Sequence, residues 1–168
     1  MMHAREAIAG RRVLVTGAAG SIGSRLVAQL QTLNPEVIVC VDRSEPGIFH
    51  LGQALAGSSN IRLEIADVQS ELRIEQLMRE YQPEIVFHAA AYKHVPLMQD
   101  NPIEAFNNNV WGTMNVMQQA LAQGAARVVY VSTDKAVNPT NIMGATKRIG
   151  ELLLGDLAAT STFTSLSG

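Results

Sequence analysis

Short apolar runs alternate along the chain with longer segments whose apolar residues recur at helical spacing, from Arg12 onward. The short runs have the length of buried strands and lie at 13–16, 37–41, 61–65, 85–88 and 128–131. The segments between and after them predict helices at 22–33, 47–56, 70–81, 103–122 and 142–159. This alternation is typical of a mostly parallel sheet with helices on both faces. We therefore predict a doubly wound α/β fold with five strands.

End signals support several of these helices. Ser70 can serve as an N-cap, Pro83 marks a stop after Tyr81, and Gly124 is placed to end the long helix. After Leu157 the sequence becomes small and polar without a clear period, where a complete doubly wound sheet would have a sixth strand. We therefore expect an irregular tail over 161–168 and a chain that lacks a C-terminal, substrate-binding part.

Length and charge narrow the class of protein. The 168 residues suffice for one core, and 47% apolar with 17% charged residues suits a sheet covered by helices. A formal net charge of -2, with no run of Lys or Arg, gives no footprint for a nucleic-acid partner. No segment approaches the roughly 18 to 20 apolar residues that span a bilayer, and the start is not a signal peptide. We expect a soluble, cytoplasmic protein without a membrane segment.

Cysteine and histidine positions argue against disulfides and metal sites. Cys40 is the only cysteine and lies in the apolar run 37–41, which favours a small buried core residue. Four histidines show no metal-ligand spacing, so core or surface roles are expected for them: His3, His50, His88 and His94. We expect no metal site.

The first predicted strand runs into a glycine-rich turn of the pattern G-x-x-G-x-x-G at the head of a helix. Gly17 can make the tight turn, Gly20 lets the backbone approach a pyrophosphate, and Gly23 allows close packing of helix on strand. The helix N-terminus offers N–H groups and a positive dipole end to phosphates. An ordinary tight turn is the alternative for the glycines alone.

An acidic residue at the end of the second strand completes a dinucleotide-binding pattern. Asp42 lies 19 residues after Gly23, where its carboxylate can accept hydrogen bonds from the adenosine ribose. It would repel a 2′-phosphate, whereas the adjacent Arg43 could pair with one. We therefore expect NAD as the cofactor, with NADP as the alternative, and a dinucleotide-binding domain over 11–160 that follows an N-terminal extension over 1–10.

Two later segments can complete this cofactor site. Asp67 and Val68 follow the third strand and could hold the adenine, although a plain loop explains them equally well. Three alanines after the fourth strand leave room for a dinucleotide, and close helix packing is their alternative explanation. The expected cofactor-binding residues are Gly17, Ala19, Gly20, Ser21, Ile22, Gly23, Asp42, Arg43, Ser44, Asp67, Val68, Ala89, Ala90, Ala91 and Lys147.

The segment 132–147 places acid, base and hydroxyl side chains beside a helical lysine and lacks a tyrosine. Together with 16–23, 88–96 and 109–113, it resembles the extended short-chain dehydrogenase/reductase superfamily. Within that superfamily it is most similar to the nucleotide-sugar 4,6-dehydratases of bacterial polysaccharide biosynthesis. The resemblance runs from about residue 11 to about residue 157.

The resemblance implies a sugar-nucleotide substrate, UDP-N-acetylglucosamine or a similar UDP-sugar, and a tightly held NAD or NADP. It implies hydride transfer from C4 of the sugar, loss of water across C5 and C6, and return of the hydride to C6. The subgroup it points to consists of larger, membrane-anchored proteins with a cytoplasmic catalytic domain. We expect the full-length form to be a homo-oligomer.

The resemblance also implies roles for the residues of segment 132–147. Thr133 would hydrogen-bond the sugar O4, Asp134 would protonate the departing C6 hydroxyl, and Lys135 would remove the C5 proton. Lys147 would hold the nicotinamide ribose. A lysine base must be neutral to accept a proton, and a solvated ion pair at a strand end is the alternative explanation of Asp134 and Lys135.

Met143 stands where the superfamily carries the tyrosine of Tyr-x-x-x-Lys, one helical turn before Lys147. A thioether is neither an acid nor a base, so Met143 cannot take the proton from O4. Methionine at this position matches the membrane-anchored subgroup, and core packing is its ordinary role. The O4 base therefore stays open between Asp134, acting through Thr133, and a bound water.

Three further residues are candidates for the site. Asn109 falls in a helix where the resemblance implies an asparagine that shapes the active site. Lys93 and His94 follow the fourth strand, at the edge of the sheet where ligands bind in such folds, and we expect them to contact substrate or phosphate. Two other functions stay open: a sugar-nucleotide epimerase or reductase of the same superfamily, and a non-catalytic dinucleotide-binding module.

Overall fold

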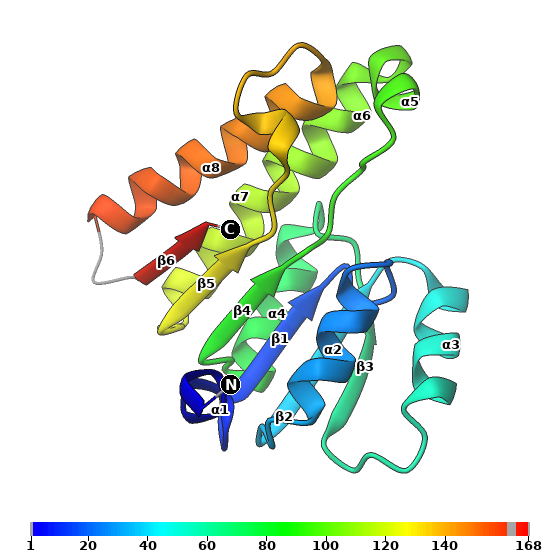
Figure 1. The fold of residues 1–168 in the computed structure, drawn as a ribbon, viewed down its shortest axis with the longest axis vertical. Helices are drawn as coiled ribbons and strands as arrows, with labels where there is room; N and C mark the ends of the chain where they lie inside the picture. The colour runs from blue at the N-terminus through cyan, green and yellow to red at the C-terminus, as the bar shows by residue number, and fades with distance from the viewer. Residues whose placement is uncertain (1, 161–163, 168) are drawn as a thin grey trace.

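A computed structural model describes residues 2–160 and 164–167 of the protein. Six parallel strands form one sheet in the order β3-β2-β1-β4-β5-β6 (Figure 1). They are β1 (Arg12–Thr16), β2 (Val37–Asp42), β3 (Ile61–Ile65), β4 (Ile85–His88), β5 (Arg127–Tyr130) and β6 (Thr164–Ser167). The strand order reverses between β1 and β4, so the connections that leave these two neighbouring strands run in opposite directions. In such sheets, ligands bind in the crevice that this reversal leaves at the carboxyl ends of the strands.

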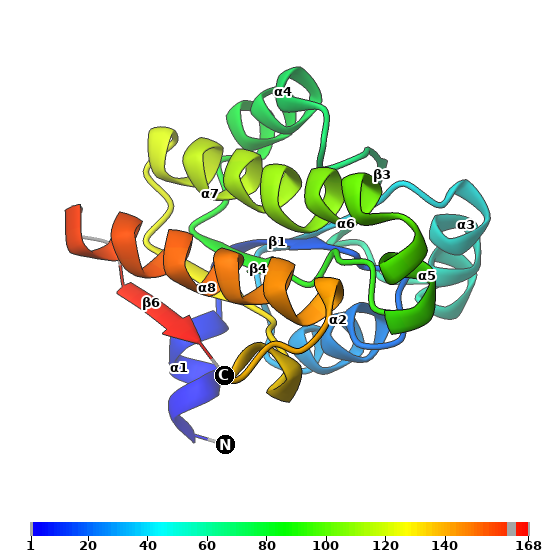
Figure 2. The same ribbon diagram turned by 90° about the horizontal axis from the view of Figure 1, so that it is seen from above.

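Helices cover both faces of the sheet (Figure 2). One face packs against α1 (Met2–Ile8), α2 (Gly23–Gln31) and α3 (Glu45–Ala54). The other packs against α4 (Glu71–Tyr81), α7 (Gly112–Ala122) and α8 (Ile142–Thr160). The remaining helical segments are α5 (Val95–Asp100), α6 (Pro102–Phe106), the π-helical turn η1 (Asn107–Trp111) and the 3₁₀ turn η2 (Asp134–Ala136).

Strand residues alternate between two hydrophobic clusters because successive side chains of a strand point to opposite faces. In β1, Val13 and Val15 pack with α2, whereas Leu14 packs on the side of α4 and α7. Cys40 is fully buried, as its apolar surroundings predict. Burial of side chains on both faces explains why β1 and β2 contain continuous apolar runs.

The predicted fold class and the five predicted strands are confirmed, and so are two of the predicted helix ends. Gln82 ends α4 with a φ of 43° directly before Pro83, and Gly124 follows α7 with a φ of 74°. Ser70 occupies the N-cap position of α4, but its side chain makes no capping hydrogen bond.

Several elements differ from the sequence prediction. The long helix predicted over 103–122 is interrupted by η1, and α1, α5 and η2 were not predicted. The prediction of an irregular tail is wrong over Thr164–Ser167, because this segment forms β6 through parallel pairing with β5. The tail residues 161–163 and 168 lie outside the described part of the chain.

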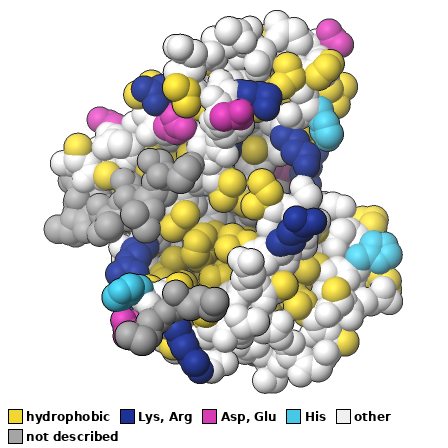
Figure 3. Space-filling view, viewed as in Figure 1, with side chains coloured by type: hydrophobic (Ala, Val, Ile, Leu, Met, Phe, Trp, Pro, Cys, Tyr) yellow, Lys and Arg dark blue, Asp and Glu magenta, His cyan; other side chains and the backbone are white. Residues whose placement is uncertain are grey.

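A groove on the α2 side of the sheet carries apolar side chains at its surface (Figure 3). It lies between α2 and the strands β4 and β5, with Ile22, Leu26, Phe87, Val129 and Val131 in its lining. Within the described ranges, no helix is both long and apolar enough to cross a bilayer.

Candidate functional site

A cleft lies at the carboxyl ends of the strands, at the point where the strand order reverses. It consists of two hollows that share Gly17, Gly20, Ala89, Ala91 and Tyr92. The Asp42 hollow is further lined by Val41, Asp42, Arg43, Ala66, Asp67, Val68, Ala90 and Asn108. The Lys147 hollow is further lined by Ser21, Ile22, Gly23, Lys93, His94, Val131, Ser132, Thr133, Lys135, Met143 and Lys147. The structure therefore brings most of the predicted site residues to one continuous cleft.

The glycine-rich turn between β1 and α2 forms the floor that the two hollows share. Gly17 has a φ of 68°, and a Cβ there would lie 2.6 Å from the backbone nitrogen of Ala90. A Cβ on Gly23 would collide with the carbonyl oxygen of Gly17, so the start of α2 packs directly on the turn. A Cβ on Gly20 would meet, among the described residues other than its chain neighbours, only the Gly17 carbonyl oxygen within 4 Å, at 3.2 Å. This backbone leaves room for a phosphate to approach the helix N-terminus.

The Asp42 carboxylate is fixed by two backbone N–H groups. Its Oδ2 accepts a hydrogen bond from Ala19 at 3.1 Å, and its Oδ1 accepts one from Ser44 at 2.9 Å. Ser44 also caps α3, since its hydroxyl accepts from the Gly47 nitrogen at 3.2 Å. Ala19 and Ser44 were predicted to bind cofactor, but neither lines the cleft, and their contacts orient Asp42.

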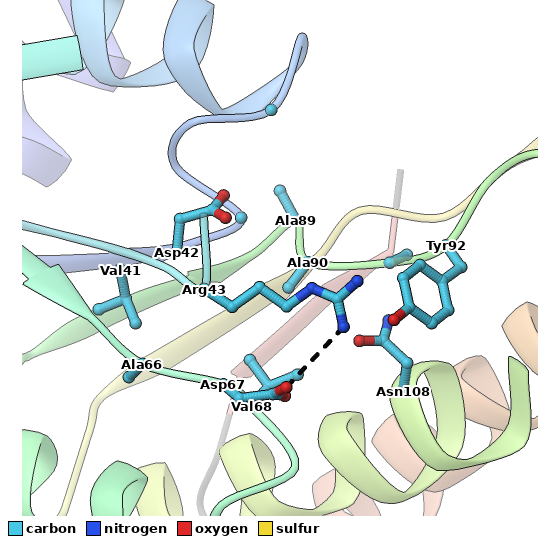
Figure 4. A pocket seen from close by; sticks show the side chains of 13 residues that line it. Val41, Asp42, Arg43, Ala66, Asp67, Val68, Ala89, Ala90, Tyr92 and Asn108 are labelled. Carbon is cyan, nitrogen blue, oxygen red and sulfur yellow. Dashed lines mark ion pairs between the residues drawn. The ribbon is translucent and has the colours of Figure 1, made fainter. Parts of the chain in front are cut away.

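Arg43 extends across the Asp42 hollow (Figure 4). Its guanidinium carbon lies 4.5 Å from the centroid of the Tyr92 ring, and its Nη1 lies 3.8 Å from Asp67 Oδ2. Asp67 Oδ1 accepts a hydrogen bond from the Gln69 nitrogen at 2.9 Å. Both oxygens of Asp67 therefore have partners within the chain.

Tyr92 and Asn108 line the cleft but were missed by sequence reasoning. Tyr92 lies in an irregular segment between β4 and α5, and no pattern marks it. Asn108 is one of three consecutive asparagines, of which the sequence singled out only Asn109. In the π-helical turn η1, the side chains of three successive residues, 108 to 110, are buried.

Asn109 does not line the cleft but joins three of its walls. Its side-chain oxygen accepts from the Tyr92 nitrogen at 2.8 Å and from Asn108 Nδ2 at 3.0 Å. Its Nδ2 donates to the Tyr92 carbonyl at 3.0 Å and to Thr146 Oγ1 at 3.1 Å. The side chain is 1% exposed and has all of its hydrogen-bonding capacity used. Asn109 thus ties η1 to the segment after β4 and to the helix that carries Lys147.

The buried imidazole of His88 joins Thr16, at the end of β1, to Thr113, in the first turn of α7. Thr113 Oγ1 donates to the Asn109 carbonyl at 2.6 Å, so it accepts from His88 Nε2 at 2.9 Å. Nδ1 of His88 therefore carries no proton and accepts from Thr16 Oγ1 at 2.6 Å. Burial, helped by the charge of Lys147, lowers the pKa of His88 to about 3.

Lys147 is 5% exposed and points from α8 into the Lys147 hollow. Its ammonium donates to the carbonyl oxygen of Val131 and lies 4.0 Å from the centroid of the Tyr130 ring. Burial lowers the pKa of Lys147 to about 8, although the nearby Glu151 carboxylate acts in the opposite direction. Lys147 can therefore gain or lose a proton near neutral pH.

Some residues of segment 132–147 line the cleft, and others face solvent. Thr133 and Lys135 line the Lys147 hollow, whereas Asp134 does not. Thr133 Oγ1 donates to Asp134 Oδ1 at 3.0 Å, and Lys135 Nζ lies 3.6 Å from the same oxygen. This hydrogen bond, together with the charge of Lys135, holds the pKa of Asp134 below its ordinary value. Asp134 is therefore a carboxylate at neutral pH.

Met143 lies in the wall of the Lys147 hollow and is 4% exposed. It packs with the buried side chains of Met98 and Ala105. Lys93 and His94 also line this hollow, and Lys93 Nζ donates to Ser21 Oγ at 2.9 Å. The lysine therefore bridges the segment after β4 and the glycine-rich turn.

The fold and the cleft define a Rossmann-fold domain of the short-chain dehydrogenase/reductase type. Residues 13–166 match the model of a family described as polysaccharide biosynthesis protein. The chain belongs to this polysaccharide biosynthesis family, within the extended short-chain dehydrogenases/reductases.

Named relatives agree with this assignment. The chain is 44% identical over 162 residues to the capsular polysaccharide biosynthesis protein CapD of Staphylococcus aureus, with 94% of this chain and 27% of the relative covered. It is 35% identical over 145 residues to a UDP-N-acetylglucosamine 4,6-dehydratase (inverting) of Campylobacter jejuni, with 86% and 42% covered. The chain thus spans less than half the length of these two relatives.

A solved structure with the same fold contains a dinucleotide. It is a UDP-glucose-4-epimerase from Stenotrophomonas maltophila with bound NAD and formylated UDP-arabinopyranose. The TM-score is 0.83 at 28% identity, and the match covers 94% of this chain and 52% of the epimerase.

Proposed function

We propose that this chain forms the cofactor-binding and catalytic portion of a nucleotide-sugar 4,6-dehydratase that acts on a UDP-N-acetylglucosamine-type substrate. The observation that carries the proposal is the set of side chains around the Lys147 hollow. Thr133, Lys135 and Lys147 meet there beside the glycine-rich turn, while Met143 stands where a redox tyrosine would be needed. The relatives named as polysaccharide biosynthesis and dehydratase proteins support the same class of reaction.

The residues present fit a dinucleotide. Gly17 and Gly20 leave room for the pyrophosphate, and Asp42 offers a fixed carboxylate to the adenosine ribose. The same carboxylate would repel a 2′-phosphate, and Arg43 is already engaged with Asp67 and Tyr92. These contacts favour NAD over NADP. When bound, the nicotinamide would accept a hydride from C4 of the sugar and return it to C6.

The chain's own side chains would then move the protons. Thr133 Oγ1 faces the hollow and donates to Asp134, which is the direction of a relay from the sugar O4 to the Asp134 carboxylate. Of the two routes for O4 deprotonation, this contact favours the one through Thr133. Asp134 lies outside the hollow, so once protonated in that step it would return the proton through the Thr133 hydroxyl to the departing C6 hydroxyl.

Lys135 lines the hollow, and its neutral amine would take the proton from C5. Its side chain is 51% exposed and pairs with Asp134 in the free protein, so substrate must displace water and separate this pair. Protonation of Asp134 would remove the charge that pairs with Lys135 Nζ at 3.6 Å and so release the lysine side chain to reach the substrate. The order of steps, Asp134 before Lys135, follows from this coupling.

A sugar-nucleotide epimerase is the second candidate, because a solved epimerase shares the fold. Simple C4 oxidation and reduction in the superfamily relies on the tyrosine that Met143 replaces. A thioether cannot exchange a proton with O4. Met143 therefore favours dehydration, in which the acid and base of segment 132–147 have separate tasks.

Product mass distinguishes these reactions. The purified protein is incubated with NAD and UDP-N-acetylglucosamine, and a full-length dehydratase relative serves as the positive control. We expect a 4-keto-6-deoxy product that is lighter than the substrate by one water. A product of unchanged mass would indicate epimerisation, and bound cofactor without any product would indicate a binding module.

A further inference from the structure

Glu151 is a partly buried carboxylate beside the cleft that has no role in the reaction as proposed so far. It lies on α8 one turn after Lys147, and its side chain is 20% exposed. Its Oε1 accepts from the Ser132 hydroxyl at 2.6 Å, and its Oε2 accepts from Arg148 Nη1 at 2.8 Å. The hydrogen bond from Ser132, together with the one from Arg148, holds the pKa of Glu151 below its ordinary value. Glu151 is therefore a carboxylate at neutral pH.

Ser132 belongs to a short stretch of chain between two regular elements. The strand β5 ends at Tyr130, and the turn η2 begins at Asp134. Thr133 follows Ser132 with an extended backbone, at a φ of -149° and a ψ of 152°. The position of the Thr133 hydroxyl, which we propose to contact the sugar O4, therefore depends on contacts made outside the sheet.

The helix α8 supplies contacts that hold this stretch. Lys147 donates to the Val131 carbonyl, and Glu151 accepts from the Ser132 hydroxyl. A Cβ on Gly144 would collide with a carbonyl oxygen of η2, so that turn lies directly on the first part of α8. Positions 144, 147 and 151 are spaced by three and four residues and so share one face of the helix. The chain between β5 and η2 is thus anchored at three points on one face of α8.

The charge of Glu151 also acts on Lys147, because it opposes the lowering of the Lys147 pKa by burial. The other titratable side chains that act on Lys147 or line its hollow are His88, Tyr130, Lys93, His94 and Lys135. Burial keeps His88 and Tyr130 uncharged at neutral pH, and the remaining three are bases. Asp134 on η2 lies outside the hollow and pairs with Lys135. Among the described residues, Glu151 is thus the carboxylate that favours the ammonium form of Lys147.

We propose that Glu151 is a positioning residue of the dehydratase site, which holds Ser132, and with it Thr133, against α8 and supplies a counter-charge to Lys147. This inference rests on the proposed function, in which Thr133 contacts the sugar and Lys147 holds the nicotinamide ribose. The alternative is an ordinary ion pair with Arg148 on the helix surface. Such a pair would contribute little and would affect neither Thr133 nor Lys147.

Glu151→Gln tests the charge, because it keeps an acceptor for Ser132 and removes only the negative charge. Lys147 should then titrate at lower pH than in the wild-type protein, as measured by NMR of ¹³C-labelled lysine without cofactor or substrate. The alkaline limb of the turnover profile should move in the same direction. Glu75→Gln is the matched control, since Glu75 pairs with Arg79 within a helix and does not line the cleft, and it should change neither measurement.

Ser132→Ala tests the hydrogen bond, because it leaves the Glu151 charge in place. Lys147 should titrate as in the wild-type protein, whereas the Thr133 methyl group should become more mobile in NMR relaxation. Turnover should fall about tenfold or more at an unchanged KM for the sugar nucleotide, since a misplaced hydroxyl affects the reacting geometry more than binding. Ser132→Thr restores the hydroxyl and should recover most of the lost turnover.

Two results would overturn the inference. An unchanged titration of Lys147 in Glu151→Gln would remove the counter-charge, and an unchanged Thr133 methyl signal in Ser132→Ala would remove the positioning role. If the wild-type protein forms no product, the proposed dehydratase activity of this chain fails. The two NMR measurements need no substrate and would then decide the inference by themselves.

Discussion

The ammonium nitrogen of Lys147 lies 4.0 Å from the centroid of the Tyr130 ring and donates to the carbonyl oxygen of Val131. Both contacts join α8 to the end of β5, from which the chain continues into Thr133. The lysine is thus held at the strand end that also presents the candidate catalytic hydroxyl. In this position the ammonium group is buried, and burial disfavours its charged form. The pKa of Lys147 is therefore lowered to about 8.

Lys147→Met should change how stability depends on pH. The unfolded chain binds the Lys147 proton below about pH 10.5, whereas the folded protein does so only below about pH 8. Stability of the wild-type protein therefore rises with pH between these values, by at most about 3 kcal/mol from this group. Urea unfolding from pH 7.5 to 10.5 should show the methionine variant without this rise. Parallel curves for the two proteins would contradict the burial of the charge.

His88 should make the protein sensitive to acid. Its pKa is about 3 in the folded protein and near 6.5 when unfolded, so stability is lost as pH falls from 6.5 toward 3. Each pH unit in this window costs about 1.4 kcal/mol. His88→Gln retains a donor and an acceptor and should flatten this dependence in urea unfolding between pH 7 and 4.5.

A spectroscopic measurement checks the same histidine independently. Nitrogen-15 NMR of the wild-type protein should show the neutral tautomer with the proton on Nε2, as the bonds to Thr16 and Thr113 require. An imidazolium signal at pH 6 would contradict the assignment.

Gly17→Ala should abolish dinucleotide binding. The new Cβ would lie 2.6 Å from the Ala90 nitrogen, and the φ of 68° adds backbone strain. We expect a loss of about 3 kcal/mol or more in the free energy of unfolding. Gly124→Ala is the matched control, since its φ is 74° but no atom of the described residues beyond its chain neighbours lies within 4 Å of the new Cβ, and it should cost about 1 kcal/mol without affecting NAD affinity. Equal effects of the two substitutions would argue against a specific role of the turn.

Met143→Leu should leave turnover within about threefold of the wild-type value, because the side chain packs with Met98 and Ala105 and transfers no proton. The unfolding free energy should change by less than about 1.5 kcal/mol. A loss of turnover of about a hundredfold or more, in the range of general acid–base groups, would contradict a packing role. Met143→Tyr provides a complementary variant that restores the superfamily pattern and should not raise the rate of dehydration.

The fold was largely predictable because both faces of the sheet are buried. Five strands stand out as apolar runs, and glycine and proline mark several helix ends. The strand β6 could not be recognised, since Thr164–Ser167 has only one large apolar residue, Leu166, and is defined by pairing with β5. Neither could η1, because a π-helical turn depends on how Asn108, Asn109 and Val110 are buried together and has no propensity of its own.

Residues of the site that belong to a sequence motif were predictable. Residues whose position depends on contacts with other side chains were less so. The glycine-rich turn, Asp42 and Lys147 are found at the cleft as their spacing predicts. Asp134 lies outside it, because the 3₁₀ turn η2 directs Thr133 and Lys135 inward while Asp134 faces solvent. Tyr92 and Asn108 emerge only from tertiary contacts with Arg43 and Asn109.

Incorporation of solvent deuterium tests the central claim of dehydration most directly. The protein, NAD and UDP-N-acetylglucosamine are combined in D₂O, and the position of the label in the product is read by NMR. Removal of the C5 proton and later reprotonation from solvent predict a 4-keto-6-deoxy sugar with deuterium at C5, and Lys135→Met should abolish its formation. A C4 epimer of unchanged composition without label at C5 would contradict the dehydratase assignment.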